Sequence, residues 1–484
     1  MWSYYLRNGL ICAMLLLSAM VNAQQSINQL INNQALKHAS VGVSVVDLNS
    51  GNMIVEHNGV KSMTPASVMK IMTTSTALEV LGANWRYKTE VALDADDPTR
   101  ILVIGAGDPT LGSDVFQGDK DAFFINATNL IKKSLPNDVE YSVYVVDELF
   151  GYDGVSPEWT WIDLGNYYAS ATYGISLYDN TYRLIFNTTD LNSCPKIVRT
   201  DPNIVGLNFT NKLTLNNTGR DNAYIYGAPF SNERTVSGNI PGGRSTFSIK
   251  GDIPDPGLLL GQTLARYMNK AGYKVKEVNT SRDDYLAGYC DVGTKKNERY
   301  RVGQSLFTYV SRPMREIVRE INVKSNNHYA EHLIRTIGRF VSSDTYSDAL
   351  ELGTKKVSDF WKSKGVDVTS LTMHDGSGLA PQDAVSPQML TDVMYYMYAK
   401  SLNKDDFAGS LPKAGQEGTV INFMKNSKYN GKIIAKSGSI GGVQCYVGYL
   451  FDGDKKYAFS IMINKFNGTR TQVRSAIEKF LLSL

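Results

Sequence analysis

A serine and a lysine three residues apart, Ser67 and Lys70, open an apolar run that resembles the start of a helix. On a helix, residues i and i+3 share a face, so the hydroxyl and the amine can form a hydrogen bond. A serine hydroxyl becomes a good nucleophile only when a base removes its proton. A lysine can be that base when burial or a neighbouring cation lowers its pKa. The pair therefore predicts a nucleophilic serine with its own base.

The pair alone is weak evidence, because S-x-x-K should occur about twice by chance in a chain of this length. A second copy, Ser401 and Lys404, lies in polar surroundings and is set aside. An ordinary helix start remains an open interpretation of Ser67 and Lys70 until other residues are considered.

Two later stretches carry complementary chemistry. In the first, Ser325 and Asn327 form an S-x-N pattern at the head of a predicted helix, where a hydroxyl could relay a proton and an amide could hold a substrate. In the second, Lys436, Ser437 and Gly438 lie in a predicted strand. The lysine supplies positive charge, the serine can bind a carboxylate, and the glycine lets a peptide lie close to the strand edge. The order of the three patterns is far more specific than any one of them.

The elements that must position these residues predict an α+β fold. Residues 39–58 read as a β-hairpin, and residues from about 86 to 255 are rich in short β-branched runs. Strands near both ends with helices between them indicate one α+β domain split by a long β-rich insertion. The remaining expected helices are 256–273, 307–340, 347–365, 386–401 and 470–484, and the expected late strands lie in 432–452 and 455–466.

Composition and the N-terminus indicate an exported globular protein. The 484 residues are 43% hydrophobic and 20% charged, with a net charge of +3 and no basic block, so nucleic acid is not an expected partner. Arg7 precedes an apolar run that ends before Val21-Asn22-Ala23. We interpret residues 1–23 as a secretory signal peptide, with an uncleaved anchor as the alternative. Beyond it, Cys194 and Cys290 could pair, whereas Cys445 is predicted to be a buried small hydrophobe.

Together the three patterns resemble those of the penicillin-binding proteins and serine β-lactamases. Ser325 follows Ser67 by 258 positions, and such a gap is similar to that of the low-molecular-mass class C penicillin-binding proteins, the D-Ala-D-Ala carboxypeptidase/endopeptidase (penicillin-binding protein 4) group. Further stretches agree with that group, among them GAGDPTL, PEWTWID, HDGSGLAPQDAVSP, LPKAGQEGT and KSGSIGGV.

The resemblance implies a split serine β-lactamase/transpeptidase-like domain with two β-rich inserted domains, the second nested in the first. The catalytic domain would comprise residues 24–92 and 292–484. Insert domain II would comprise 93–178 and 252–291, and nested insert domain III would comprise 179–251.

The resemblance also implies a role for each matching residue. Ser67 would be the acylated nucleophile, Lys70 its base and Ser325 a proton relay toward the leaving amine. Backbone N–H groups of Ser67 and Ser439 would stabilise the oxyanion. Substrate-binding residues would be Asn327, Lys436, Ser437, Gly438 and Ser439, the loop residues Asp375, Gly376, Ser377 and Gly378 at the cleft rim, and Asp163, which would receive the ammonium of a diaminopimelate side chain.

The implied reaction is acyl transfer from peptidoglycan stem peptides ending in D-Ala-D-Ala, or from their cross-links, in the periplasm. No cofactor or metal is needed, and β-lactam antibiotics should act as inhibitors. The sequence leaves open the balance of carboxypeptidase and endopeptidase activity, transpeptidation, a homodimer and peripheral contact with a membrane.

Other interpretations use the same residues. His328, Glu331 and His332 match H-x-x-E-H, the zinc pattern of inverted zincins. A serine β-lactamase shares the three patterns, although no E-x-x-[LN]-N-like motif follows the first helix. A slow peptidoglycan-binding scaffold is a third alternative. Asp163 could also be a solvated loop acid, and the DGSG stretch a simple turn.

Overall fold

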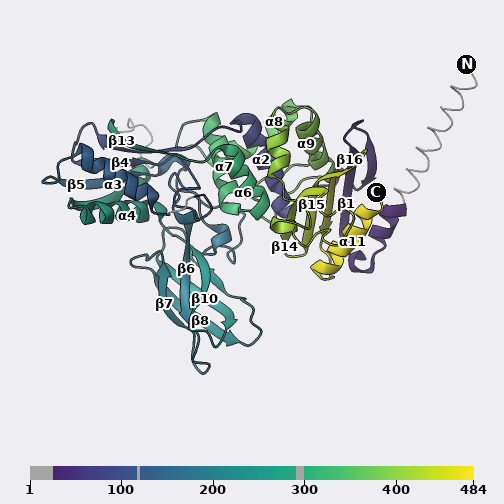
Figure 1. Ribbon diagram of the computed structural model, residues 1–484, viewed down its shortest axis with the longest axis horizontal. Coiled ribbons are helices and arrows are strands. Elements are labelled where there is room, and N and C mark those ends of the chain that lie inside the picture. The colour runs from purple at the N-terminus through teal and green to yellow at the C-terminus, as the bar shows by residue number, and fades with distance from the viewer. Residues whose placement is uncertain (1–24, 117–119, 290–298) are drawn as a thin grey trace, which may run out of the picture. The chain divides into compact units, whose positions relative to one another are not determined.

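The computed structural model describes residues 25–116, 120–289 and 299–484, so the predicted signal peptide and Cys290 lie outside the described residues. The described chain divides into two compact units (Figure 1). Unit 1 takes the described part of Met1–Ala83 with Met314–Asn326 and Thr354–Leu484, and unit 2 takes Asn84–Pro313 with Asn327–Gly353. Among the helices of the described ranges, none has the length and apolar character that a membrane span requires.

Unit 1 is built on a five-stranded antiparallel sheet that joins the two ends of the chain. The strand order is β14-β15-β16-β1-β2. The strands are β1 (Ser40–Asp47), β2 (Met53–His57), β14 (Ile433–Ile440), β15 (Val443–Asp452) and β16 (Lys455–Asn464). The predicted hairpin is confirmed as β1 and β2, and β1 also pairs with β16, more than 400 positions later.

Both faces of this sheet are covered, which explains why β1 is buried along almost its whole length. Val41, Val43 and Val45 join a core that includes apolar residues of α11 (Arg470–Leu482). On the opposite face, Ser44 Oγ lies 2.7 Å from Thr391 Oγ1 of α9 (Pro387–Ala399). Figure 1 shows the sheet between α11 and helices α2 and α9. The alternation of side chains along a strand thus places one set of β1 residues against each helical layer.

The other helical elements of unit 1 are short. Residues 25–31 are helical, and the further elements are η1 (Gln34–Leu36), η2 (Ala66–Met69), α2 (Lys70–Val80), α6 (Met314–Lys324), α10 (Lys404–Ser410) and η6 (Gly418–Val420). Helix α8 (Ala349–Ser363) spans the boundary between the units.

Unit 2 contains a mixed five-stranded sheet of order β12-β5-β4-β3-β13. Its strands are β3 (Lys88–Asp94), β4 (Arg100–Ile104), β5 (Glu140–Val146), β12 (Lys274–Thr280) and β13 (Val302–Val310), and its helical elements are α3 (Ala122–Ser134), η3 (Glu148–Phe150), η4 (Tyr167–Ala169), η5 (Tyr178–Asn180), α4 (Pro256–Lys270), α5 (Arg282–Tyr289) and α7 (Asn327–Val341). The pairs β4–β5 and β5–β12 are parallel. Parallel neighbours need a crossover, and α3 supplies it between β4 and β5.

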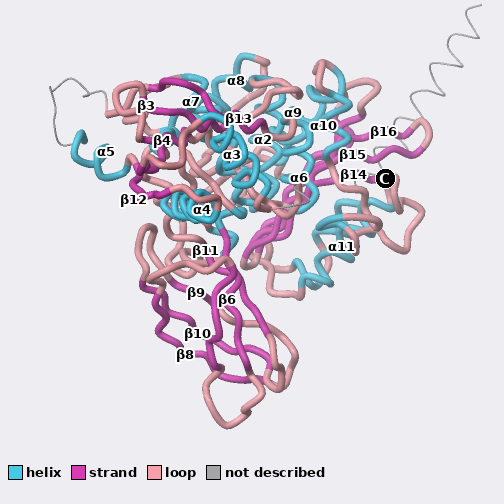
Figure 2. Tube along the Cα trace, turned by 60° about the vertical axis from the view of Figure 1, so that its left-hand side comes forward, coloured by secondary structure: helices cyan, strands magenta, loops and turns pink. Residues whose placement is uncertain are grey.

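Two three-stranded sheets occupy residues 181–252 of unit 2. Their orders are β11-β6-β7 and β8-β10-β9. The strands are β6 (Thr181–Asn187), β7 (Lys196–Asp201), β8 (Asn208–Asn216), β9 (Tyr224–Tyr226), β10 (Glu233–Pro241) and β11 (Phe247–Asp252). Figure 2 shows β6, β8, β9 and β10 gathered side by side. This segment coincides closely with the range 179–251 proposed as a nested insert.

Two sequence expectations need correction. The proposed domain boundary at residue 92 falls inside β3, and the segment from 292 that was given to the catalytic domain contains β13, which pairs with β3. Pairing in one sheet assigns both strands to unit 2. The helix expected from residue 307 is also wrong over its first turn, because residues 307–310 complete β13. The expected helices farther along are confirmed as α6 and α7.

Candidate active site

Ser67 and Lys70 meet where a 3-10 turn passes into a helix. Ser67 is half-buried in η2, and Lys70 is the first residue of α2. The completely buried Lys70 Nζ donates a hydrogen bond to Ser67 Oγ at 3.1 Å. The preceding Ala66 has a φ of 49°, a conformation that non-glycine residues adopt rarely and that often marks functional turns. The predicted juxtaposition of serine and lysine is therefore present, on a strained turn.

The DGSG loop lies beneath this pair, not at a rim. Asp375 and Ser377 are completely buried, and the carbonyl oxygen of Ser377 accepts a hydrogen bond from Lys70 Nζ at 2.6 Å. The carbonyl oxygen of Gly376 accepts one from Thr73 Oγ1 of α2 at 2.7 Å. The expectation that these residues contact substrate stays a prediction, and their burial favours a supporting role. They hold the lysine amine in position.

Asp375 explains the shape of the loop. Its two carboxylate oxygens accept hydrogen bonds from the backbone N–H groups of Ser377, Gly378, Leu379 and Ala380 at 2.6–3.0 Å. Gly378 has a φ of 77°, and a Cβ at this position would lie 1.9 Å from the carbonyl oxygen of Ala66. Only glycine satisfies both conditions. The loop thus fixes the turn that presents Ser67.

Ser325 and Lys436 meet close to this pair in the same unit. Ser325 lies in the two-residue connection after α6 and has a φ of 58°. Lys436, in β14, donates from Nζ to Ser325 Oγ at 2.9 Å and to its neighbour's carbonyl, that of Ser437, at 2.7 Å. Burial, and secondly the positive charge of Lys70, lower the pKa of Lys436 well below its ordinary value. Two buried amines in one site resist carrying two positive charges.

Successive residues of β14 point to opposite faces of its sheet. Lys436 and Gly438 are buried, whereas Ser437 and Ser439 point outward. A Cβ on Gly438 would lie 2.5 Å from the carbonyl oxygen of Pro65, so glycine allows β14 to lie against η2. Strand β14 is the terminal strand of its sheet. Residues 412–414 pair with the first part of its outer edge, at Ile433–Ala435, and the part beyond it, from Ser437 to Ile440, is suited to pairing with an extended peptide.

A cavity of about 290 Å³ in unit 1 joins these residues. Its lining residues are Ser67, Ser325, Thr419, Ser437, Ser439, Gln444, Tyr446, Arg470 and Arg474. Ser437 Oγ donates to Thr419 Oγ1 at 2.8 Å. The sequence reasoning did not anticipate the two arginines. Their i, i+4 spacing at the start of the closing helix was the available signal.

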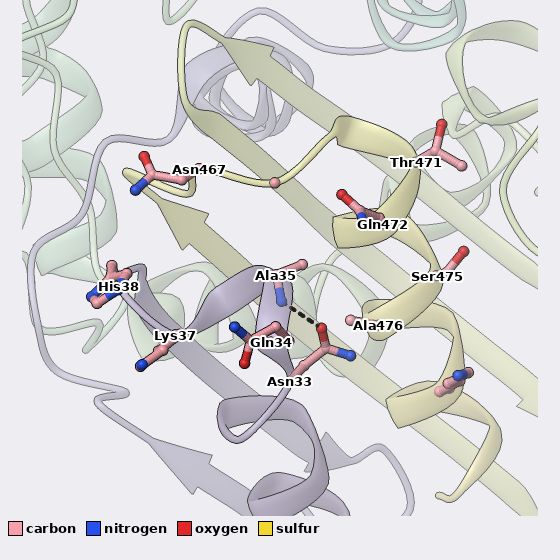
Figure 3. Close-up of a pocket in the computed structure, with 12 residues that line it drawn as sticks. Asn33, Gln34, Ala35, Lys37, His38, Asn467, Thr471, Gln472, Ser475 and Ala476 are labelled. Atoms are coloured by element: carbon pink, nitrogen blue, oxygen red, sulfur yellow. Dashed lines mark hydrogen bonds between the residues drawn. The ribbon is translucent and has the colours of Figure 1, made fainter.

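A second cavity of unit 1, of about 590 Å³, lies between α11 and the N-terminal segment (Figure 3). Figure 3 shows Thr471, Gln472 and Ser475 on the helix side, opposite Asn33 and neighbouring residues. It is larger than the first cavity, but none of the predicted site residues lines it. We therefore take the smaller cavity as the candidate active site.

A family model described as the D-Ala-D-Ala carboxypeptidase 3 (S13) family matches residues 23–484. The chain belongs to this S13 family. The protein is accordingly a serine hydrolase, a peptidase that acts on D-Ala-D-Ala peptides of peptidoglycan. The resemblance inferred from the three sequence patterns is confirmed.

Individual relatives agree with the S13 assignment. A D-alanyl-D-alanine carboxypeptidase from Actinomadura sp. (strain R39) is 26% identical over 92% of this chain and 81% of its own length. A crystal structure of penicillin binding protein 4 from Haemophilus influenzae superposes with a TM-score of 0.74 at 20% identity, covering 95% of this chain and 97% of that one. A second structure of that protein, complexed with a β-lactam, gives a TM-score of 0.71 at 18% identity, covering 94% and 98%. The transpeptidase-like fold with inserted domains is therefore confirmed.

Two predicted S13 site residues, Asn327 and Asp163, belong to unit 2. Asn327 begins α7, two positions after Ser325, and its Nδ2 donates to the carbonyl oxygen of Tyr168 at 2.8 Å. Asp163 is half-buried and accepts a hydrogen bond from Thr160 Oγ1 at 2.6 Å. Burial, and secondly the charge of Asp163, raise the pKa of Tyr168. The loop that carries Asp163 is thus connected through Tyr168 to the head of α7.

The H-x-x-E-H residues serve packing in unit 2. Both nitrogens of His328 lie within hydrogen-bonding distance of serine hydroxyls, Ser170 at 3.0 Å and Ser176 at 2.8 Å. Glu331 forms a buried ion pair with Arg335, with 2.9 Å between oxygen and nitrogen. His332 Nδ1 lies 2.8 Å from the carbonyl oxygen of Gly107. These hydrogen bonds and the ion pair give the three residues a role in core packing. Within the described ranges, no cluster of three or more potential metal ligands occurs.

We expect His328→Gln to flatten the pH dependence of stability. Burial, and secondly the charge of Arg335, lower the pKa of His328 to about 3, whereas the unfolded chain protonates this ring near pH 6.5. The unfolded state therefore binds more protons below pH 6.5, and stability falls with pH. Urea unfolding at pH 6.5 and 5 should show a loss about 2 kcal/mol smaller in the variant. Equal losses would contradict the neutral, buried ring.

Proposed function

We propose that this chain is a D-Ala-D-Ala carboxypeptidase and D-alanyl-diaminopimelate endopeptidase that acts through a Ser67 acyl-enzyme. The observation that carries the proposal is the 3.1 Å contact between Lys70 Nζ and Ser67 Oγ, on a serine that lines one cavity with Ser325 and Ser437. Acyl transfer requires a nucleophile, a base and a proton relay, and in this proposal Ser67, Lys70 and Ser325 have these roles. Ser437 would donate a hydrogen bond to the carboxylate of the substrate.

The proposed reaction begins when neutral Lys70 takes the proton of Ser67 and Ser67 Oγ attacks the carbonyl carbon of the penultimate D-Ala. The backbone N–H groups of Ser67 and Ser439 stabilise the resulting oxyanion. The C–N bond then breaks, and the leaving amine receives a proton through Ser325, whose hydroxyl is held by Lys436. Attack by water on the ester releases the shortened peptide and restores Ser67.

The proposed substrate lies along the edge of β14. An extended peptide would add to this edge as a strand, with the Asn327 amide holding its backbone and the Ser437 hydroxyl near its terminal carboxylate. Lys436 and Gly438 would form the floor. In this proposal Asp163 binds the ammonium group of the diaminopimelate side chain by a charge-assisted hydrogen bond.

β-Lactam antibiotics are the proposed inhibitors. A related H. influenzae protein has been crystallised with a β-lactam, and a Dictyostelium discoideum relative is named a penicillin-sensitive carboxypeptidase. A β-lactam mimics the D-Ala-D-Ala end, so it should acylate Ser67 and leave slowly. The proposed site of action is the periplasm, because residues 1–23 resemble a secretory signal and the substrate lies outside the cytoplasmic membrane.

The test is digestion of purified muropeptide monomers and cross-linked dimers, with products identified by mass. We expect monomers to lose their terminal D-Ala and dimers to yield monomers. Asp163→Ala should reduce kcat/KM on diaminopimelate-containing peptides about 10- to 100-fold, the effect of one hydrogen bond to a charged group.

The matched comparison is a D-Ala-D-Ala model peptide without the side-chain ammonium. On that peptide Asp163→Ala should retain the activity of the parent. An equal loss on both substrates would reject the role of Asp163, and an absence of D-Ala release by the parent would reject the proposed function itself.

A further inference from the structure

The cavity that holds Ser67 has an excess of positive charge that the proposed chemistry does not use. Arg470 and Arg474 lie one turn apart on α11, and both line this cavity. None of the described residues that line it is acidic. Two guanidinium groups on the wall of a cavity without carboxylates indicate that the ligand brings the negative charge.

Of the two arginines, Arg470 is better placed to bind an anionic ligand. Its Nη1 donates to Ser439 Oγ at 3.2 Å and its Nη2 donates to the carbonyl oxygen of Ile440 at 3.2 Å, so the end of β14 fixes the guanidinium plane. Arg474 forms an ion pair with Glu478, with 4.0 Å between Nε and Oε1. Among the described residues Arg470 has no such acidic partner.

The reaction supplies an anion at this place. In a substrate bound along β14, the α-carboxylate of the leaving amino acid is separated from the scissile nitrogen by a single carbon. The outward-facing Ser437 and Ser439 mark the same stretch of the strand. A guanidinium recognises a carboxylate through two parallel N–H···O bonds, which a terminal carboxamide cannot accept in the same way.

We infer that Arg470 is the specificity-determining residue for the free α-carboxylate of the leaving D-amino acid, an inference that rests on the proposed function. D-Ala and the D-centre of diaminopimelate both carry such a carboxylate beside the leaving nitrogen. One guanidinium therefore serves both carboxypeptidase and endopeptidase reactions, and cross-links whose diaminopimelate carboxylate is amidated are poor substrates.

The experiment compares two peptides that differ at one group, an N-acylated tripeptide ending in D-Ala-D-Ala and its C-terminal carboxamide. Arg470→Gln should lower kcat/KM on the acid about 10- to 100-fold and leave the value on the amide within about threefold of the parent. Arg470→Lys keeps the charge but loses the planar fork, so it should fall between parent and Arg470→Gln on the acid.

Lys479→Gln is the matched control, because it removes one positive charge from the same helix at a residue that lines the other cavity. It should leave both peptides unaffected. Equal losses on acid and amide in Arg470→Gln, at an unchanged melting temperature, would overturn the inference. If Arg470→Gln does not fold, the same comparison in Arg470→Lys decides. If the inference is overturned but the parent cleaves both peptides in a Ser67-dependent way, the proposed function still stands. If the parent cleaves neither peptide, both the proposed function and the inference are rejected.

Discussion

Ser67→Ala is expected to abolish covalent labelling by fluorescent penicillin and to lower kcat/KM on D-Ala-D-Ala peptides by about 10⁵- to 10⁶-fold, the size of effect seen when a serine nucleophile is deleted. The substitution removes the only atom of Ser67 that can form the ester and one hydrogen bond from Lys70. Because Ser67 is half-buried and alanine suits the same turn, the melting temperature should stay within a few degrees of the parent.

The chain contains its own control for this experiment. Ser401 and Lys404 repeat the S-x-x-K spacing, but Ser401 Oγ donates to Glu79 Oε1 at 2.5 Å, and Lys404 begins α10. Ser401→Ala should therefore label as strongly as the parent. Labelling of a folded Ser67→Ala variant, or its loss in Ser401→Ala, would place the nucleophile elsewhere.

Lys70→Met should slow acylation by a β-lactam about 10³- to 10⁴-fold, the upper range for loss of a general base. The variant retains Ser67 and most of the apolar stem, but nothing else takes the serine proton. The acylation rate constant, measured with a fluorescent penicillin, reports the loss of the base.

Lys70→Arg separates base catalysis from electrostatics at the same position. A guanidinium keeps the positive charge but cannot be deprotonated in a protein. If Lys70 acts as the base, Lys70→Arg is as slow as Lys70→Met. A rate above about a tenth of the parent would instead mean that the charge at residue 70 is sufficient.

Most of the site could be predicted from sequence because its chemistry is carried by local patterns. Ser67 and Lys70 are one turn apart, and the strand character of β14 follows from its apolar run. The role of the DGSG loop could not be predicted in the same way. Burial of Asp375 and Ser377 depends on packing against α2, about 300 positions earlier in the chain. A sequence shows that a loop is short and polar, but not which side of the nucleophile it supports.

The same limit explains the errors in the fold. Residues 307–310 precede a strongly periodic helix, and only their pairing with β3 makes them a strand. Helix α3 was missed within the β-rich region, although Phe123, Phe124, Ala127 and Ile131 lie on one buried face. Arg470 was assigned to a closing helix without a role, because its place beside Ser439 depends on tertiary contact.

The pairing of β1 with β16 has a consequence for how the protein is made. While the chain is being synthesised, β1 emerges early and its partner only after more than 400 further residues, so one edge of the first hairpin stays open throughout. Exposed strand edges invite association with other chains, and contacts this distant in sequence form slowly. We therefore expect the nascent chain to need chaperones that cover this strand edge. Truncated chains that end before β14 should have no activity on peptidoglycan.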